Sequence, residues 1–311
     1  MKNNLYVIIV VYNGMRWLER CLNSVKSATV RAQIVIIDNG STDGSADYIR
    51  ANFSDVSLIC SGKNLGFGKA NNLGIEMALN NGAEYVYLLN QDAWVQPKTF
   101  ETLIDLHRGD PDYGILSPMQ VDASEIRLDK NFENLSAKKS DCFLNDLLFG
   151  KLKPVYEIHF VMAAHWLVSR DCLLAVGGFS PVFPHYGEDD DFASRARFHH
   201  FKIGFCPFCL GVHDRENRPV PLSKEAYMAY IKFLARSTDV GCPANIFCNL
   251  LRQLKMQAEL SLKMHSIDVI KYLWLSVEKI PLIFRIRKEA RIRRPNFLNL
   301  NADGVASGGE E

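Results

Sequence analysis

The stretch LYVIIVVYNG (residues 5–14) opens the pattern that decides the fold. Its first seven residues form a continuous run of apolar, mostly β-branched side chains, which predicts a strand covered on both faces. Tyr12, Asn13 and Gly14 break the run. Residues 17–27 then carry apolar side chains at helical spacing, so we expect the strand to lead through a short loop into a helix.

The same alternation repeats along the first hundred residues. The expected strands are residues 5–11, 33–37, 56–60 and 85–89, and the expected helices are residues 17–27, 45–52 and 70–80. This order predicts an α/β fold, with a Rossmann-like, mostly parallel sheet and helices on both faces. Ligands of such sheets bind at the carboxyl ends of the strands. The loops that follow the strands are therefore where we expect the functional residues.

The later sequence sets the domain organisation. The 311 residues fit one large domain or two modest ones, at about 150 residues per domain. Residues 161–168 and 201–213 predict two further strands, whereas residues 122–157 are polar and irregular, as in an insertion. We expect an α/β domain over residues 1–220, a helical C-terminal extension over residues 221–298, and a disordered polar tail over residues 299–311.

Composition excludes several classes of protein. Hydrophobic residues make up 48% of the chain and charged residues 23%, which excludes a wholly disordered chain. The net charge is +1, which argues against a nucleic-acid-binding protein that works through bulk charge. The start MKNN shows no signal-peptide pattern and the eight cysteines are scattered, so we expect a cytoplasmic protein with reduced thiols. No apolar run reaches the roughly 18 residues of a membrane span.

The loop DNGSTDGS (residues 38–45) follows the second strand. Its first residue, Asp38, ends the strand with a carboxylate that can accept hydrogen bonds from a base or a ribose. The same residue types also favour ordinary turns and helix caps, so the loop alone leaves both interpretations open.

The stretch NLGFGKANN (residues 64–72) follows the third strand. Its two glycines let a ligand approach the backbone, and the helix N-terminus after them suits a diphosphate. The stretch lacks the third glycine of the dinucleotide-binding fingerprint.

The tripeptide NQD (residues 90–92) follows the fourth strand. Asp92, with the amide oxygen of Asn90 two residues earlier, could hold a divalent cation beside a diphosphate. A simple turn at the strand end is the alternative.

The sharpest signal is the acidic stretch YGEDDDF (residues 186–192). Four consecutive carboxylates repel one another, which raises the pKa of some of them, and such a carboxylate can take a proton from a hydroxyl group. The alternative is an exposed acidic turn that opens a helix. Apolar flanking residues, among them Phe179, Phe183 and Phe198, argue against a purely solvated run.

A basic stretch, RIRKEARIRR, runs from Arg285 to Arg294 with six basic residues and one acidic residue. Ile286 and Ile292 interleave with the charges. The stretch is open to two interpretations, contact with an anionic membrane surface or a solvated helix.

Together and in this order, the motifs resemble glycosyltransferase family 2, the inverting nucleotide-sugar enzymes of the GT-A fold, and most closely its bacterial rhamnosyltransferase-like branch. The resemblance covers about residues 5–215 and implies that the α/β domain is catalytic. VVYNG is similar to the first nucleotide loop of the family and implies that Tyr12 and Asn13 lie near the base. DNGSTDGS implies that Asp38 accepts from the base or ribose. NLGFGKANNLGI implies nucleotide-sugar contacts from four residues: Asn64, Gly66, Phe67 and Asn71.

The resemblance also implies a metal site. LLNQDAWV occupies the place of the acid-x-acid motif of the family. Asp92 is then the main ligand for Mg²⁺ or Mn²⁺, while Asn90 stands where an Asp is common. His213 falls where many relatives place a further metal or phosphate contact.

The segment GGFSPVFPHYGEDDDFASRAR resembles the family segment that carries the catalytic base, and its best match is Asp189. Glu188 and Asp191 are expected to position the acceptor or tune the base. Arg195 is expected to balance the acidic cluster or the diphosphate.

The implied function is inverting transfer of a sugar from a UDP- or dTDP-sugar to a hydroxyl group of a saccharide or lipid-linked glycan, in the synthesis of bacterial cell-surface polysaccharide. Such an enzyme is expected in the cytoplasm or peripherally on the inner face of the membrane. A sugar-nucleotide pyrophosphorylase is an alternative, but the loop after the first strand is poor in glycine. A non-catalytic nucleotide-sugar-binding protein is a second alternative, which Asn90 favours and the intact acidic cluster disfavours.

Overall fold

The computed structural model describes residues 4–215, 222–241, 245–264 and 271–301. The strands are β1 (Leu5–Val11), β2 (Gln33–Asp38), β3 (Ser57–Cys60), β4 (Tyr85–Asn90), β5 (Ala93–Val95), β6 (Tyr113–Val121), β7 (Tyr156–Glu157), β8 (His165–Ser169) and β9 (Lys202–His213). The helices of the α/β domain are α1 (Met15–Lys26), α2 (Ser45–Asn52), α3 (Phe67–Asn80), α4 (Thr99–Gly109), α5 (Lys130–Leu135), α6 (Phe143–Leu148), α7 (Arg170–Val176) and α8 (Glu188–Phe198). The C-terminal helices are α9 (Leu222–Thr238), α10 (Ile246–Met264), α11 (Lys271–Glu278) and α12 (Ile280–Ala290).

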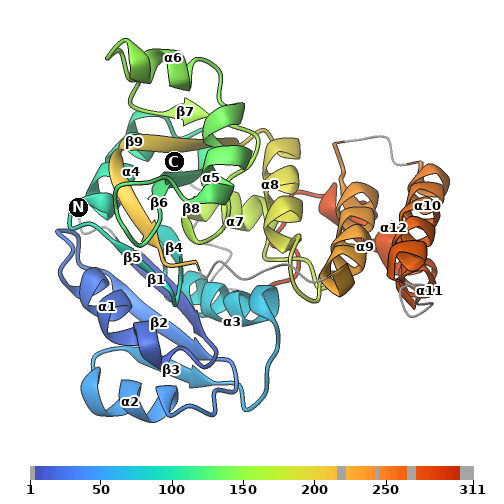
Figure 1. Ribbon diagram of the computed structural model, residues 1–311. Helices are drawn as coiled ribbons and strands as arrows, with labels where there is room; N and C mark the ends of the chain where they lie inside the picture. The colour runs from blue at the N-terminus through green and yellow to red at the C-terminus, as the bar shows by residue number, and fades with distance from the viewer. Residues whose placement is uncertain (1–3, 216–221, 242–244, 265–270, 302–311) are drawn as a thin grey trace.

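Within the described residues, the strands form one sheet in the order β3-β2-β1-β4-β8-β6-β9-β5, with β7 paired to β9. The first four strands are parallel, and β6 is parallel to β9. Three strands run the other way: β8 between β4 and β6, and β5 and β7 against β9. Figure 1 shows helices on both faces of the sheet and the C-terminal helices beside it. The predicted α/β fold with a mostly parallel sheet is confirmed.

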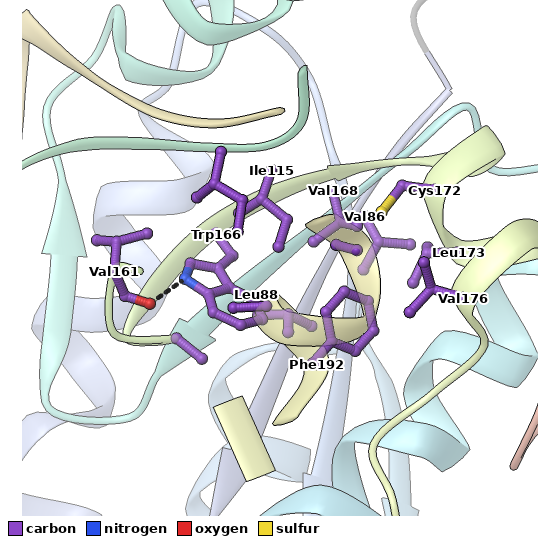
Figure 2. Packing of buried hydrophobic residues seen from close by; sticks show 14 of the residues in the cluster. Val86, Leu88, Ile115, Val161, Trp166, Val168, Cys172, Leu173, Val176 and Phe192 are labelled. Atoms are coloured by element: carbon purple, nitrogen blue, oxygen red, sulfur yellow. Dashed lines mark hydrogen bonds between the residues drawn. The ribbon is translucent and has the colours of Figure 1, made fainter. Parts of the chain in front are cut away.

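Alternate residues of each strand point to opposite faces of the sheet, which divides the core in two. Val7 and Ile9 of β1 pack with helices α1, α2 and α4 on one face. Ile8 packs with α3, α7 and α8 on the other face. Figure 2 shows Trp166 of β8 at the centre of this second layer, next to Phe192 of α8, with ring centroids 5.6 Å apart. This packing fixes α8, and with it the acidic stretch, against the sheet.

Residues 122–157 are more regular than their sequence predicts. They contain two short helices, α5 and α6, and the strand β7. Aromatic side chains at irregular spacing hold the segment, because Phe132, Phe143 and Tyr156 all pack around Phe205 of β9, with ring centroids 5.0–5.5 Å apart. The missing periodicity explains why the pattern of residues did not predict these elements.

The C-terminal helices pack against the segment that precedes α8. Val182 and Phe183 share an apolar cluster with α9 and with Ile283 and Ile286 of α12. The expected disordered tail begins in contact with α3, because the N–H of Asn299 donates to the carboxylate of Glu76 at 2.9 Å. Residues 302–311 of the expected tail lie outside the described residues.

The basic stretch from Arg285 to Arg294 is partly structural. Arg287 is buried, and its guanidinium donates to the backbone carbonyls of Ser237 and Asp239. Arg285 and several of its neighbours are exposed. Within the part of the chain that the structure covers, no helix combines the length and the apolar character that crossing a membrane requires.

Candidate active site

The carboxyl ends of β1, β2 and β4 bring the first functional loops together. In the sheet register, Val11 is opposite Asp38, and Val10 is opposite Asn90. Tyr12 and Asn13 follow β1 directly, so the two predicted nucleotide loops and the NQD tripeptide share one edge of the sheet, as the sequence predicts.

Hydrogen bonds connect the first two loops. Asn13 has a left-handed backbone, with φ 50°, and its side-chain oxygen accepts from the N–H of Thr42 at 2.8 Å. Its own N–H donates to Ser41 Oγ at 3.0 Å. Asp38 is buried and accepts from the N–H of Ser41 at 3.3 Å. The turn interpretation of this loop is therefore correct, and it leaves acceptor capacity on Asp38 because a carboxylate can accept about four hydrogen bonds. The side chain of Tyr12 is 45% exposed at the same edge.

Gln91 is a residue that sequence reasoning missed. Its side-chain oxygen accepts from the N–H of Tyr12 at 2.8 Å, and its side-chain nitrogen donates to the carbonyl of Tyr12 at 3.2 Å. A Cβ on Gly14 would collide with that oxygen, so a side chain there would displace the amide of Gln91. The pair of bonds joins the loop after β1 to the loop after β4. The position of Gln91 between Asn90 and Asp92 was the only signal of this role in the sequence.

The glycine-rich stretch supports the acidic segment. Gly66 has φ +81°, and a Cβ there would lie 2.7 Å from the carbonyl oxygen of Pro184. Asn64 accepts from the N–H of Gly66 at 2.8 Å and from the side chain of Asn39 at 3.1 Å. The ring of Phe67 packs edge-on against Phe179, with centroids 5.8 Å apart. The stretch therefore packs closely against the segment that leads into α8.

The structure does not place Asn71 or Arg195 at a nucleotide-binding surface. Asn71 is buried, and its amide donates to the carbonyl of Phe67 at 3.0 Å. Arg195 is 1% exposed and donates to Asp191 at 2.8 Å, to the carbonyl of Val176 at 2.7 Å and to that of Gly178 at 2.8 Å. These bonds satisfy a buried charge, which explains why the guanidinium faces the interior rather than a diphosphate.

Asp191 is likewise not placed to meet an acceptor, because it is 3% exposed and paired with Arg195. Together the two side chains anchor α8 to the loop after α7. Asp191 and Arg195 are four residues apart on a helix, and this spacing is the sequence signal for the pair.

A second cluster forms where the turn between β4 and β5 meets the end of β9. His213 Nε2 lies 3.4 Å from Asp92 Oδ1 and 3.5 Å from the amide nitrogen of Asn90. On the other side of the ring, Nδ1 lies 3.7 Å from Asp129 Oδ2, which also accepts from Arg215 at 3.2 Å. Asp129 lies in the segment where the sequence showed no chemistry. It is an N-cap, accepting from two backbone N–H groups of α5, and this capping role hid it.

The electrostatics of this cluster favour an ionised Asp92. Burial alone would raise the pKa of Asp92, but the hydrogen bond and charge of His213 and the charge of Arg215 outweigh it and hold the pKa below its ordinary value. The side-chain oxygen of Asn90 is buried and has no hydrogen-bond partner in the structure. The structure thus brings together the three predicted metal-site residues, Asn90, Asp92 and His213.

The acidic stretch forms the first turn of α8. Tyr186 and Gly187 both have left-handed backbones, with φ 66° and 84°, which turn the chain into the helix. Asp189 is half-buried. Burial and the charge of Asp190 raise the pKa of Asp189 to about 6, although backbone hydrogen bonds, including one from Ala163, act against the shift. A carboxylate with a pKa near neutrality is suited to accept a proton from a hydroxyl group.

Glu188 differs from its neighbour. It is 6% exposed, and its Oε2 has no hydrogen-bond partner. Burial and the charge of Asp189 raise the pKa of Glu188 to about 8.

A short segment before β8 connects the two halves of the site. Asp189 meets the backbone of Ala163, while the carbonyl of the next residue, Ala164, accepts from the N–H of Asn90 at 3.1 Å. The acidic turn and the NQD tripeptide therefore share one support. The fold, with its strand-end loops and carboxylates, defines a glycosyltransferase of the GT-A type.

Comparison with known proteins gives the family. Residues 6–172, more than half of the chain, match the family model described as glycosyl transferase family 2. The chain belongs to this family, and the resemblance inferred from its motifs is confirmed.

Two similar relatives carry names of sugar transferases. The low-salt glycan biosynthesis hexosyltransferase Agl10 of Haloferax volcanii is 26% identical over 242 residues, which cover 76% of this chain and 75% of the relative. The N-acetylglucosaminyl-diphospho-decaprenol L-rhamnosyltransferase of Mycobacterium tuberculosis is 30% identical over 224 residues, covering 63% and 71%.

Two solved structures share the fold. Residues 1–349 of S. aureus TarS superpose with a TM-score of 0.56 at 14% identity, over 97% of this chain and 89% of that one. The mannosyltransferase PcManGT from Pyrobaculum calidifontis, in complex with GDP-Man and Mn²⁺, gives 0.54 at 17% identity, over 92% and 76%.

Proposed function

We propose that this glycosyltransferase inverts the anomeric carbon of a nucleoside-diphosphate sugar, UDP- or dTDP-linked, as it transfers the sugar to a saccharide or lipid-linked glycan. The observation that carries the proposal is Asp189, a half-buried carboxylate with a pKa of about 6 that meets the segment supporting Asn90. The names of the hexosyl- and rhamnosyltransferase relatives, one of them in glycan biosynthesis, support a role in the synthesis of glycans.

The reaction follows from the chemistry of the site. Tyr12, Asn13 and Asp38 lie at the edge where the base and ribose of the donor are expected, and Asp38 accepts hydrogen bonds from them. Asp189 takes the proton of the acceptor hydroxyl group as its oxygen forms a bond to the anomeric carbon. The bond from that carbon to the diphosphate breaks, and the nucleoside diphosphate leaves. Because the attack comes from the opposite face, one displacement inverts the configuration.

A divalent cation fits the donor set near β4. Asp92 supplies an ionised carboxylate, and Asn90 and His213 supply an unpartnered amide oxygen and an imidazole. In the described parts of the chain, no three His, Cys, Asp or Glu side chains form a ready-made cage. In phosphate-handling sites Mg²⁺ is typically held by one or two carboxylates and by substrate phosphates. Such a cation, Mg²⁺ or Mn²⁺, would neutralise charge on the leaving diphosphate.

The acceptor has a candidate place beside this cluster. A cavity of about 480 Å³ opens next to the carboxyl ends of β6 and β9. Six of its lining residues are charged, as suits hydroxyl-rich sugars, and Leu128 adds an apolar contact: Asp122, Arg127, Asp129, Lys130, Glu133 and Arg215. We place the acceptor saccharide in this cavity.

The test is a donor screen with purified protein. UDP- and dTDP-sugars are incubated with Mg²⁺ or Mn²⁺ and a glycan acceptor, and release of nucleoside diphosphate and the anomeric configuration of the product are measured. We expect metal-stimulated release and an inverted product. Pyrophosphate made from a nucleoside triphosphate would instead indicate a pyrophosphorylase, and binding without turnover would indicate a non-catalytic protein.

A further inference from the structure

Helix α10 presents an apolar stripe to solvent. Phe247, Leu251, Leu254 and Leu262 are 68%, 49%, 48% and 76% exposed, and the exposed Ala258 continues the row. Their spacing puts them on one side of the helix. At 1.5 Å per residue the stripe is about 22 Å long. Figure 1 shows α10 at the edge of the molecule farthest from the sheet.

The buried side of α10 is partly polar, because three amide side chains lie there beside the buried Leu260. Asn249, Gln253 and Gln257 are at most 7% exposed. Asn249 donates to Ser237 Oγ at 3.2 Å, and Gln257 donates to the carbonyl of Ala226 at 3.0 Å. Amide hydrogen bonds and the apolar contacts of Leu250 and Leu260 hold α10 against α9, and the exposed stripe faces outward. Contiguous exposed apolar surface of this kind marks an interaction site.

Charges beside the stripe indicate what it contacts. The residues that follow the apolar positions form a second exposed row containing Arg252, Lys255, Glu259 and Lys263, with three positive charges against one negative. Two copies of the chain that met stripe to stripe would bring these basic rows together and repel each other. An apolar face with basic residues along its flank is instead typical of a helix that lies in the interface of an anionic bilayer.

We propose that α10 docks the protein on an anionic membrane, with the stripe in the headgroup region and the basic row on lipid phosphates. The membrane contact that the sequence suggested for Arg285–Arg294 stays a prediction, in which the buried Arg287 can take no part. The proposal rests on the proposed function to the extent that a lipid-linked acceptor resides at such a surface.

The test measures binding of the full chain to vesicles of phosphatidylcholine with and without phosphatidylglycerol, by flotation. The variant Phe247→Glu/Leu262→Glu adds two charges to the stripe. Its matched control, Phe208→Glu/Leu148→Glu, makes the same changes at side chains that are 62% and 77% exposed on β9 and α6. We expect wild type to bind the anionic vesicles, the stripe variant to bind at least about tenfold more weakly, and the control to stay within about twofold.

A second variant, Arg252→Glu/Lys255→Glu, keeps the stripe and reverses the charge, and should also lose binding to anionic vesicles. Absence of wild-type binding, or equal loss in the stripe variant and its control, would overturn the proposal. So would a wild-type dimer in solution that the stripe variant converts to monomers. Nucleoside diphosphate release with a water-soluble acceptor should be unchanged in all variants, which separates failure of the docking proposal from failure of the proposed function.

Discussion

Replacing Glu188 by glutamine tests whether the first turn of α8 holds a neutral carboxyl group. Glutamine keeps the shape of the side chain and removes its ionisation. In the wild-type protein, burial and the charge of Asp189 raise the pKa of Glu188 from 4.5 to about 8. The unfolded chain releases this proton near pH 4.5, whereas the folded chain keeps it until about pH 8.

The size of the effect follows from this difference. Between these two pH values the folded protein binds one more proton than the unfolded protein, so the free energy of unfolding falls by about 1.4 kcal/mol per pH unit. The stabilisation is fully present below pH 4.5 and is lost as the pH rises through about 8. The loss is on the order of 3–5 kcal/mol, or roughly 10 °C in Tm for a chain of this size.

The assay is thermal unfolding at pH 5 and pH 8.5 without metal or donor. Between pH 5 and pH 8.5, the Tm of wild type should fall by roughly 10 °C more than the Tm of Glu188→Gln. Glu19→Gln, at an exposed glutamate of α1, serves as the matched control and should follow wild type at both. If the difference in Tm between Glu188→Gln and wild type were the same at both pH values, the claim that Glu188 is buried in its neutral form would be refuted.

Three further substitutions test other parts of the site. Arg195→Ala leaves the carboxylate of Asp191 buried without its partner and should lower the free energy of unfolding by about 3–5 kcal/mol in a urea titration; a loss below about 1 kcal/mol would contradict the anchoring role. Gly66→Ala places a Cβ 2.7 Å from a carbonyl oxygen at a residue with φ +81°, whereas Gly62 has a similar φ of +69° and open space around it. An alanine in the left-handed conformation costs roughly 1–2 kcal/mol of the free energy of unfolding. Gly62→Ala should cost about that much, and Gly66→Ala clearly more. Asp92→Asn should raise the Mg²⁺ or Mn²⁺ concentration for half-maximal transfer by at least about tenfold, and an unchanged metal titration would remove Asp92 from the metal site.

The sequence predicts the sheet well because its signals are local. The β-branched runs of β1, β2 and β4 were placed within one residue of their ends, and α2 was placed without error. Buried parallel strands need continuous apolar runs, and such runs are readable from one sequence. The same logic located Asp38 and Asp92, since strand ends of a parallel sheet share one edge.

The remaining features depend on contacts between distant segments. No local pattern shows that Asp129, a helix cap, approaches the His213 ring from the side opposite Asp92. The inward direction of Arg195 follows from the carbonyls that α7 and its loop present to it, which are known only once the chain is folded. The burial of three amides on α10, beside an exposed apolar stripe, likewise follows from the helices packed against it.

The most direct test of the catalytic assignment compares Asp189→Asn with Asp190→Asn, an exposed neighbour in the same acidic turn. For wild type, kcat/KM should fall as the pH drops through about 6, because protonated Asp189 cannot accept the acceptor proton. Asp189→Asn should lower kcat by about 10²–10⁴-fold with nucleotide binding and Tm retained, and Asp190→Asn should keep most of the activity. Full transfer activity in a folded Asp189→Asn protein would contradict the assignment of Asp189 as the catalytic base.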